Sequence, residues 1–509
     1  MELDLGELIE PVTGRRWDPL VIRRELWRRL KYFQQHGLTP SGRVFLHHGN
    51  SPEFFVDLLA IWSLGGCAVP VDPRLTEFEV KNLAEAARPR LSVWREAGEN
   101  SIVQSLAAME VKALETLSPA LPGESVTEPS LSPGLVRLDQ PALILFTSGT
   151  TGQPKGVVHT HRSLRAKWTS LRQCLGLTKF RRTLCLLPTH FGHGLICNCL
   201  FPWLSGQSLY LVPPFKPELV MRLGSLLDEH EITFLSSVPS VWRLALKLAK
   251  PPQMRRLERV FCGSAPLSAF LWKAIQEWTG TKEVVNAYGI TETGSWVAGM
   301  MKEGVEPEDG LIGEGWGTVV KVLKNAGTDQ RFGAMTECAP GESGYVWLNT
   351  PSLMQGYLAR EDLTNQVVSE GWFFTGDIGL IDDRGFLYLR GREREEISKG
   401  GMKVYPGDID AVAERYEQTL DVCTFPYRDP LHGEGIGIAV VLKTPNEEHM
   451  RILYRELNSK LAGFQMPQRW YFVTEIPRTS RGKVNRLKVA EECARLEPTD
   501  VRVLARAGG

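Results

Sequence analysis

The sequence has no excess of charge of either sign, since 59 Lys and Arg residues balance 59 Asp and Glu residues among 509. Without a basic excess, the composition gives no support for a nucleic-acid or membrane-surface partner. Long apolar runs are missing too: Asp57 interrupts the best candidate, residues 54–71, so no membrane span is predicted. The acidic stretch over residues 1–10 lacks the apolar core of a secretory signal, which favours a cytoplasmic protein.

Cysteine is scarce and unpatterned, with nine residues scattered along the chain. Cys197 and Cys199 are the one close pair, and a lone Cys-x-Cys does not match a metal-binding spacing. An odd number of scattered cysteines also argues against a disulfide framework. We expect packing roles in a reducing compartment.

The first third of the chain alternates helical and strand patterns. Apolar residues at helical spacing, Ser-Pro helix starts and short apolar runs between turn residues support this prediction. Such alternation is typical of a parallel sheet covered by helices. Helices are predicted over residues 21–35, 52–64 and 76–87, strands over 44–48, 67–71 and 91–94, and a Pro/Ser/Gly-rich surface loop over 118–134.

A compact run of hydroxyl residues and glycines follows the strand predicted at residues 142–146. It reads LFTSGTTGQPKGV over residues 145–157, with Lys155 as its single charge. Glycines let backbone N–H groups turn inward, and hydroxyls donate hydrogen bonds to anions, so we interpret the run as a phosphate-binding loop. Pro154 excludes the Walker pattern, which needs a glycine there. The alternative is a simple surface turn. The histidines that follow, His159 and His161, are expected on a helix surface.

This run resembles the signature of the adenylate-forming superfamily, which comprises acyl- and aryl-CoA ligases, peptide-synthetase adenylation domains and beetle luciferases. Further family motifs follow in the family order, and the chain is identified as a member on all of them together. They are VPVDP at residues 69–73, LLPTHFGHGL at 186–195, VPS at 238–240, CGSAPL at 262–267, NAYGITETG at 286–294, GWFFTGDIG at 371–379, GRERE at 391–395 and PRTSRGKVNR at 477–486.

The resemblance implies an α/β fold with two domains. Residues 1–392 would form a large N-terminal domain of helix-covered sheets plus a distorted β-barrel. Residues 393–509 would form a small, mobile α+β C-terminal domain. Strand patterns at residues 422–427, 437–443 and 470–475, with a helical pattern at 447–461, agree with the small domain.

The resemblance also implies the activity. Family members join a carboxylate to the α-phosphate of ATP with Mg²⁺, release pyrophosphate, and pass the acyl group to a thiol. That thiol would be coenzyme A or the phosphopantetheine of an acyl carrier protein, which is expected as a separate protein. A luciferase-like oxygenase and an inactive nucleotide-binding homologue stay open. Lys155, Glu292, Asp377 and Lys483 are all present, which argues against the inactive form.

The nucleotide-binding residues implied by the resemblance fall into three groups. The β- and γ-phosphates would meet the hydroxyl and glycine run, the adenine would meet two short motifs that include Tyr288, and the ribose would meet Asp377 and Arg392. A carboxylate accepts two hydrogen bonds and so suits a vicinal diol. Without the motifs, Tyr288 would be a core tyrosine and Asp377 a turn aspartate. The groups are Thr147, Ser148, Gly149, Thr150, Thr151 and Lys155; Gly263, Ser264, Ala265, Asn286, Ala287, Tyr288 and Gly289; and Asp377 and Arg392.

Three residues are the implied catalytic group. Thr291 would bond the α-phosphate, Glu292 would hold Mg²⁺ as a hard oxygen ligand, and Lys483 would bridge the carboxylate and the α-phosphate. A lysine in such a turn is otherwise a solvated surface charge. Arg394 would be the hinge, where many relatives have Asp or Lys. Gly400 and Gly401 would let the pantetheine arm pass close to the backbone.

The implied acyl pocket is small or apolar at most positions. Gly192 stands where peptide-synthetase domains carry an aspartate for the substrate's α-ammonium group. A buried ammonium without a partner is strongly disfavoured, so we predict an uncharged acyl or aryl tail, with glycines leaving room for bulk. The neutral form of His193 could accept one hydrogen bond. The pocket residues are Phe191, His193, Gly194, Val241, Gly263 and Gly289.

Overall fold

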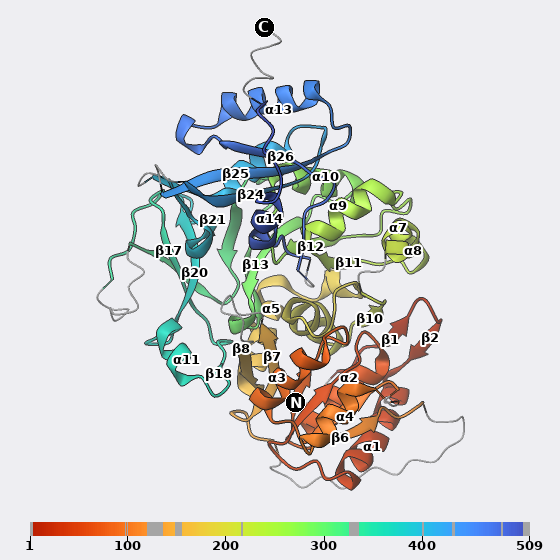
Figure 1. Cartoon of the computed structure of the whole chain (residues 1–509). Helices are drawn as coiled ribbons and strands as arrows, with labels where there is room; N and C mark the ends of the chain where they lie inside the picture. Colours follow the sequence, from red (N-terminus) through yellow and green to blue (C-terminus); the bar gives the residue numbers. More distant parts are fainter. Residues whose placement is uncertain are drawn as a thin grey trace.

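The protein is described from a computed structural model, which contains three β-sheets that follow one another from the bottom to the top of the view (Figure 1). The N-terminal region lies at the bottom of the view and the C-terminal sheet at the top. The structure describes residues 4–96, 98, 100–119, 136–147, 155–214, 217–324, 335–399, 402–429, 433–479 and 482–501.

The sheet nearest the N-terminus has the order β18-β8-β7-β4-β3-β5-β6. Its strands pair in parallel from β6 to β7, and β8 and β18 complete it in antiparallel pairing. The strands are β3 (Arg43–Leu46), β4 (Cys67–Pro70), β5 (Leu91–Trp94), β6 (Lys112–Glu115), β7 (Pro141–Thr147), β8 (Lys155–Thr160) and β18 (Gly356–Tyr357).

Side-chain caps fix where the helices of this region begin. The carboxylate of Asp18 accepts from the N–H groups of Leu20 and Val21, and the Ser51 hydroxyl accepts from Phe54 N–H. Thr76 and Glu79 form a capping box at the third helix. The helices are α1 (Pro19–Gln35), α2 (Pro52–Ser63), α3 (Glu77–Ala87) and α4 (Ser101–Ala108).

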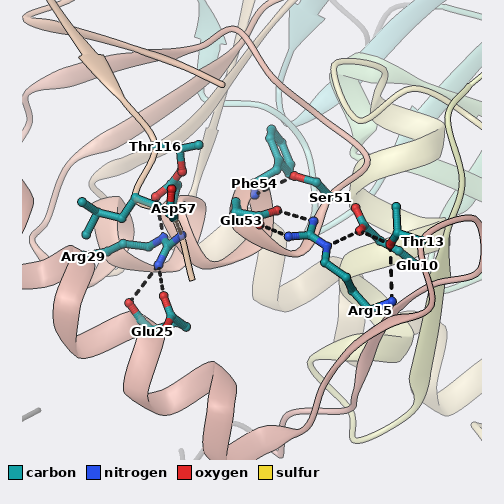
Figure 2. Close-up of polar contacts among 12 residues, drawn as sticks. Glu10, Thr13, Arg15, Glu25, Arg29, Ser51, Glu53, Phe54, Asp57 and Thr116 are labelled. Atoms are coloured by element: carbon teal, nitrogen blue, oxygen red, sulfur yellow. Dashed lines mark hydrogen bonds and ion pairs between the residues drawn. The ribbon is translucent and has the colours of Figure 1, made fainter. Parts of the chain in front are cut away.

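Charged side chains are buried between α1 and α2 (Figure 2). Arg29 Nη1 lies 2.6 Å from a Glu25 carboxylate oxygen, and Arg29 Nε lies 2.9 Å from Asp57 Oδ1. Thr116 donates to Asp57 Oδ2 over 2.6 Å. Burial opposes ionisation of Asp57, but Arg29 and its other partners hold the pKa of Asp57 below the ordinary value. Because a buried charge is stable only when paired, this network locks α1 to α2, and it explains the charge within the apolar run.

The second sheet changes from parallel to antiparallel pairing at β13 (Val284–Ile290). Its order is β16-β17-β20-β21-β15-β14-β13-β12-β11-β9-β10-β1-β2, with β19 beside β20. Among the described residues the antiparallel strands extend this sheet, and the distorted barrel stays a prediction. The other strands are β1 (Leu8–Glu10), β2 (Arg15–Trp17), β9 (Arg182–Cys185), β10 (Ser208–Leu211), β11 (Phe234–Ser237), β12 (Arg259–Gly263), β14 (Ser295–Gly299), β15 (Leu311–Gly315), β16 (Val319–Leu323), β17 (Gly344–Asn349), β19 (Val368–Ser369), β20 (Trp372–Ile381) and β21 (Leu387–Arg392).

Helical segments cover and connect these strands. They include a π-helical stretch, η2 (His193–Leu200), which is buried along its whole length. The others are α5 (His161–Leu175), η1 (Thr178–Phe180), α6 (Phe201–Trp203), α7 (Pro217–Met221), α8 (Leu223–Glu229), α9 (Pro239–Leu248), α10 (Ala269–Thr279), η3 (Thr291–Thr293) and α11 (Glu361–Val367).

The third sheet has its own core, formed by residues from Ile397 onward. The predicted domain boundary at residues 392/393 falls between β21 and η5 (Glu393–Glu395), and as a division into domains it stays a prediction. The sheet has the order β23-β22-β25-β24, with β26 beside β25. Its elements are β22 (Ile397–Lys399), β23 (Met402–Val404), α12 (Pro406–Glu414), β24 (Thr419–Asp429), β25 (Gly433–Leu442), α13 (Glu447–Lys460), η6 (Gly463–Gln465), β26 (Arg469–Phe472) and α14 (Arg486–Cys493).

The α/β fold class and the elements predicted from sequence are confirmed, with ends that differ by a few residues. The nine cysteines are free and mostly buried, as expected for packing roles. Most of the loop predicted at 118–134 lies outside the described residues. Within the described part of the chain, none of the helices is both long and apolar enough to cross a membrane.

Candidate functional site

The two ends of the hydroxyl and glycine run face each other across a strand pair. Thr147 ends β7, Lys155 begins β8, and the register makes them partners. The ammonium group of Lys155 lies 5.3 Å from the ring centroid of Tyr357, within cation–π range. Tyr357 in turn donates its hydroxyl to Glu292 Oε1 over 2.8 Å. A cation and a carboxylate from distant motifs are therefore joined through one aromatic ring.

Tyr357 is a site residue that sequence reasoning missed. It stands in β18, whose pairing with β8 brings it opposite Val157, next to the predicted phosphate loop. Nothing in its local sequence distinguishes it from a core tyrosine, and its side chain is in fact buried. The strand pairing that brings it to Lys155 spans about 200 residues, as their numbers show.

The turn that carries Thr291 and Glu292 is held by a hydrogen bond from His159. It is the single turn η3 between β13 and β14. His159 Nε2 lies 2.8 Å from the Thr291 carbonyl oxygen and donates to it. Burial lowers the pKa of His159 to about 4, so the ring is neutral at pH 7. The expectation that His159 lies on a helix surface is wrong, because it belongs to β8 and is fully buried.

The predicted ribose residues form one hydrogen-bonded group. Arg392 Nε lies 2.8 Å from Asp377 Oδ1, and the Tyr288 hydroxyl donates to Asp377 Oδ2 over 2.5 Å. The register of β20 and β21 pairs Asp377 with Arg392, so Asp377 lies within a strand and not in a turn. Burial, and then the Asp377 charge, raise the pKa of Tyr288 well above its ordinary value, which keeps its proton on the hydroxyl. Each carboxylate oxygen retains a lone pair for a ligand.

The glycines predicted to leave room for a bulky substrate tail instead lie where backbone segments approach each other closely. A Cβ on Gly263 would lie 2.2 Å from the Ala287 carbonyl oxygen, and one on Gly289 would lie 2.1 Å from the Ser295 carbonyl oxygen. A Cβ on Gly194 would likewise lie 2.5 Å from the Pro188 carbonyl oxygen. These glycines allow backbone segments to approach closely, and the interpretation that they enlarge the pocket is wrong.

Two of the predicted adenine-side residues are buried in the strand pairing of β13. The side-chain amide of Asn286 donates to the Leu311 carbonyl over 2.9 Å. Ala287 is buried where β12 and β13 pair, opposite Gly263. Ser264 and Ala265, just beyond β12, are partly exposed. The exposed part of this motif is thus the turn after the strand.

His193, in the segment of residues 186–195 that we call the gate segment, is held between two serines. Its Nδ1 lies 2.8 Å from Ser264 Oγ, and its Nε2 lies 2.6 Å from Ser236 Oγ. Burial lowers the pKa of His193 to about 3, with a further lowering from the charge of Lys483. Both ring nitrogens are engaged, so the expectation that His193 offers an acceptor to a ligand is wrong. The Phe191 ring lies beside His193, with 5.9 Å between the ring centroids, and both Phe191 and Val241 are buried.

Lys483 reaches this part of the molecule from the third sheet. Its turn is closed by hydrogen bonds from Thr479 N–H to the Lys483 carbonyl (2.7 Å) and from Lys483 N–H to Thr479 Oγ1 (3.2 Å). Gly482 has φ +76°, and a Cβ there would lie 2.7 Å from Ser240 Oγ. The turn therefore touches the start of α9, and its lysine is near enough to His193 to affect that ring's pKa. Lys483 is itself exposed, on a turn that is anchored against α9.

A set of contacts at the end of α12, which we call the α12 contact, attaches the third sheet to the second. Glu414 bonds both Arg243 of α9 and Ser268, the N-cap of α10. Arg415 pairs with Asp309, whose other carboxylate oxygen accepts from the Ala269 N–H over 2.7 Å. The Glu414 side chain is only 13% exposed, so solvent screens this pair weakly.

Several predicted residues are outside this geometry. Arg394 belongs to η5, but its side chain is not among the described groups. The remaining phosphate-loop and pantetheine residues lie outside the described part of the chain, namely Ser148, Gly149, Thr150, Thr151, Gly400 and Gly401.

Comparisons with known proteins were made on both sequence and structure. A family model described as AMP-binding enzyme matches residues 28–358. A 2-succinylbenzoate–CoA ligase of Bacillus licheniformis is 33% identical over 359 residues, which is 70% of each chain. The long-chain-fatty-acid–CoA ligase FadD13 of Mycobacterium tuberculosis is 27% identical, over 91% of this chain and 90% of its own. The crystal structure of the anthranilate CoA ligase AuaEII in complex with anthranoyl-AMP has a similar fold, with a TM-score of 0.84 at 22% identity over 97% of this chain and 95% of that one.

Proposed function

Since this chain belongs to the family of AMP-binding enzymes, we propose that it is an ATP-dependent acid–CoA ligase that works through an acyl-adenylate. The relatives named above are CoA ligases, which supports coenzyme A as the thiol. The observation that carries the proposal is the position of the Lys483 turn, which contacts the start of α9 and lies near His193, while a Cβ on Gly192 of the same gate segment would lie 3.8 Å from Thr291. Transfer to a carrier protein is the second candidate, since the same thiol chemistry would serve both.

The reaction brings together two anions, so the chain must supply positive charge and fixed geometry. We assign the β- and γ-phosphates to Lys155 and the run before it, and the ribose to Asp377 and Arg392. Thr291 would contact the α-phosphate from a turn whose carbonyl is held by His159. Lys483 would stabilise the charge that moves from the carboxylate to the departing pyrophosphate.

Glu292 fits the binding of a magnesium ion that arrives with the nucleotide. Mg²⁺ keeps several waters and is usually held by one or two carboxylates together with substrate phosphates. The Glu292 carboxylate accepts the Tyr357 hydroxyl on one oxygen and retains its other lone pairs for the ion. Among the described residues there is no group of three His, Cys, Asp or Glu side chains that could hold a resident metal. When bound, the ion would reduce the repulsion between carboxylate and phosphate.

The acid is proposed to lack an α-ammonium group. Gly192 offers no charge, and His193 beside it is held between two serines. The carboxylate that reaches the gate segment, Asp72, is already paired with His190 and Arg74. A Cβ on Gly192 would lie 3.3 Å from Leu145 and 3.8 Å from Thr291, which puts this position beside the proposed reaction centre. An ammonium ion buried here would lose its hydration without gaining a counter-charge.

The test is to incubate the protein with ATP, Mg²⁺ and a panel of acids, with and without coenzyme A, and to identify products by mass spectrometry. Acyl-CoA formation supports the proposal, whereas adenylate that never reaches coenzyme A points to a carrier protein. Failure of every acid to release pyrophosphate would favour a nucleotide-binding protein without this activity.

Acids matched in shape test the prediction about the ammonium group. We expect 3-phenylpropanoate to release pyrophosphate faster than phenylalanine, and 4-methylpentanoate faster than leucine, because each pair differs by the amino group. An amino acid as the best substrate would contradict the pocket assignment and leave the ligase assignment intact.

A further inference from the structure

The hydrogen bonds that join Ser236, His193 and Ser264 in the gate all run in one direction, which can be worked out from the hydrogen atoms available. A neutral imidazole carries one N–H donor and one acceptor nitrogen, and a serine hydroxyl carries one donor. Ser236 is fully buried in β11, and within the described part of the chain its hydroxyl bonds His193 Nε2 alone. If that nitrogen carried the proton, the buried Ser236 hydrogen would have no acceptor.

Because a buried hydroxyl hydrogen without a partner is costly, Ser236 donates to Nε2. His193 then carries its proton on Nδ1 and donates it to Ser264 Oγ, 2.8 Å away. The hydrogen of the Ser264 hydroxyl is thereby directed away from the ring. Among the described residues, Ser264 makes no other side-chain hydrogen bond, and it is partly exposed.

The backbone of Ser264 supplies a second observation. Its φ is +66°, in the left-handed region that favours glycine. A serine there is strained, and strain of this kind is concentrated at functional positions. The conformation places the hydroxyl against His193, which lies close to the turn of Lys483. A glycine would meet the backbone requirement more easily but would lack the hydroxyl.

We propose that Ser264 is a specificity residue that donates a hydrogen bond to an oxygen in the tail of the acid substrate. The inference rests on the ligase function proposed above and narrows its substrate class. The favoured acids carry a keto, ether, hydroxyl or second carboxyl oxygen beyond the reacting carboxylate, and purely hydrocarbon tails are weaker substrates. Ser236 and His193 are positioning residues that fix the direction of the donor.

The experiment compares pairs of acids that differ by one oxygen, at saturating ATP and coenzyme A. Suitable pairs are hexanoate with its 3-, 4- and 5-oxo forms, and 4-phenylbutanoate with 4-oxo-4-phenylbutanoate. For at least one pair we expect kcat/KM to favour the oxygenated acid by about tenfold, the upper range for one neutral hydrogen bond. Ser264→Gly suits the left-handed backbone, so the variant should fold, and its ratio should fall to about one.

Two further variants test whether the ratio depends on the Ser264 hydroxyl and its direction. Ser237→Ala removes the neighbouring buried hydroxyl, which has no partner among the described groups, and should keep the wild-type ratio. Ser236→Ala should lower the ratio partway, because His193 is then free to reverse its proton. A Ser264 hydroxyl that serves only the nucleotide would alter both acids of a pair equally.

The outcomes distinguish this inference from the proposed function. Wild-type protein that converts acids to acyl-CoA but treats each pair alike would overturn the inference and leave the function standing. A ratio that survives in Ser264→Gly would do the same. If no acid in either set releases pyrophosphate, the proposed function itself fails, and the inference with it.

Discussion

The candidate site has two halves that solve different recognition problems. In the charged half, Lys155 and Glu292 share Tyr357, while Arg392 pairs with Asp377. In the neutral half, His193 is held between serines and beside buried apolar residues. Charge suits a polyanion whose position must be fixed, whereas the neutral half can select only by shape and by the direction of donors. Lys483 lies near enough to His193 for its charge to lower the pKa of that ring.

Removal of the Lys483 charge should have the largest effect. We predict that Lys483→Ala lowers adenylate formation by about 10²–10³-fold, typical for the loss of one group that stabilises developing charge. Thioester formation from pre-made acyl-adenylate, which releases AMP, should be much less affected, because we expect the C-terminal region to carry Lys483 away from the site for that step. Pyrophosphate release and acyl-CoA formation measure the two steps separately. Equal losses in both steps would contradict this assignment.

Weakening the charged half should come next in size. Asp377→Asn keeps the shape but removes the charge that holds Arg392 and accepts from Tyr288. Hydrogen bonds to a charged group contribute about 1.5–3 kcal/mol, so we expect KM for ATP to rise roughly 10–100-fold. The relative kcat/KM values of different acids should stay unchanged. A change in acid preference would show that the two halves are not independent.

The two steps should also respond differently to a stiffer connection between the sheets. Arg394 lies in η5, between β21 and the third sheet, and Arg394→Pro would fix φ there. If the second step uses another orientation of the third sheet, adenylation should be spared and thioester formation slowed. A penalty of about 1.4 kcal/mol would slow it about tenfold. Unchanged thioester kinetics from isolated adenylate would argue against this hinge.

The smallest effect we predict is a loss of folding stability at low pH, which arises because His193 is buried in its neutral form. The folded pKa of His193 is about 3, below the ordinary 6.5, so the unfolded state binds more protons between these values. Stability therefore falls as pH drops below about 6.5, by about 2 kcal/mol at pH 5 for this histidine. Thermal unfolding at pH 7, 6 and 5 should show a shallower loss for His193→Asn than for wild type. Parallel losses would contradict this origin.

The sequence motifs, taken in order, led to the catalytic and ribose candidates, whose roles stay predictions. The register of β20 and β21 then brings Asp377 and Arg392 together, as their shared assignment to the ribose requires. Tyr357 was not predictable, because its role depends on the pairing of β18 with β8.

The expectation that glycines leave room in the pocket was wrong for a related reason. Gly263 and Gly289 read as open space in the pocket, but their missing side chains are replaced by backbone oxygens of neighbouring strands. A sequence shows that a side chain is small, and not what fills the volume it leaves. The same limit applies to His193, whose availability depended on two serines from other strands.

The α12 contact sets how often Lys483, which is tethered to the rest of the chain, is close to its proposed target. The lysine lies between β26 and α14, and its proposed target lies in the N-terminal part of the chain. The fraction of molecules with the lysine in place therefore depends on Glu414, Arg415 and their partners. Weakening these contacts would lower the effective concentration of the amine at its proposed target without changing any group that is proposed to contact a ligand. The rate of adenylation would then measure the fraction of molecules with Lys483 in place, and side chains at the end of α12 would set that fraction.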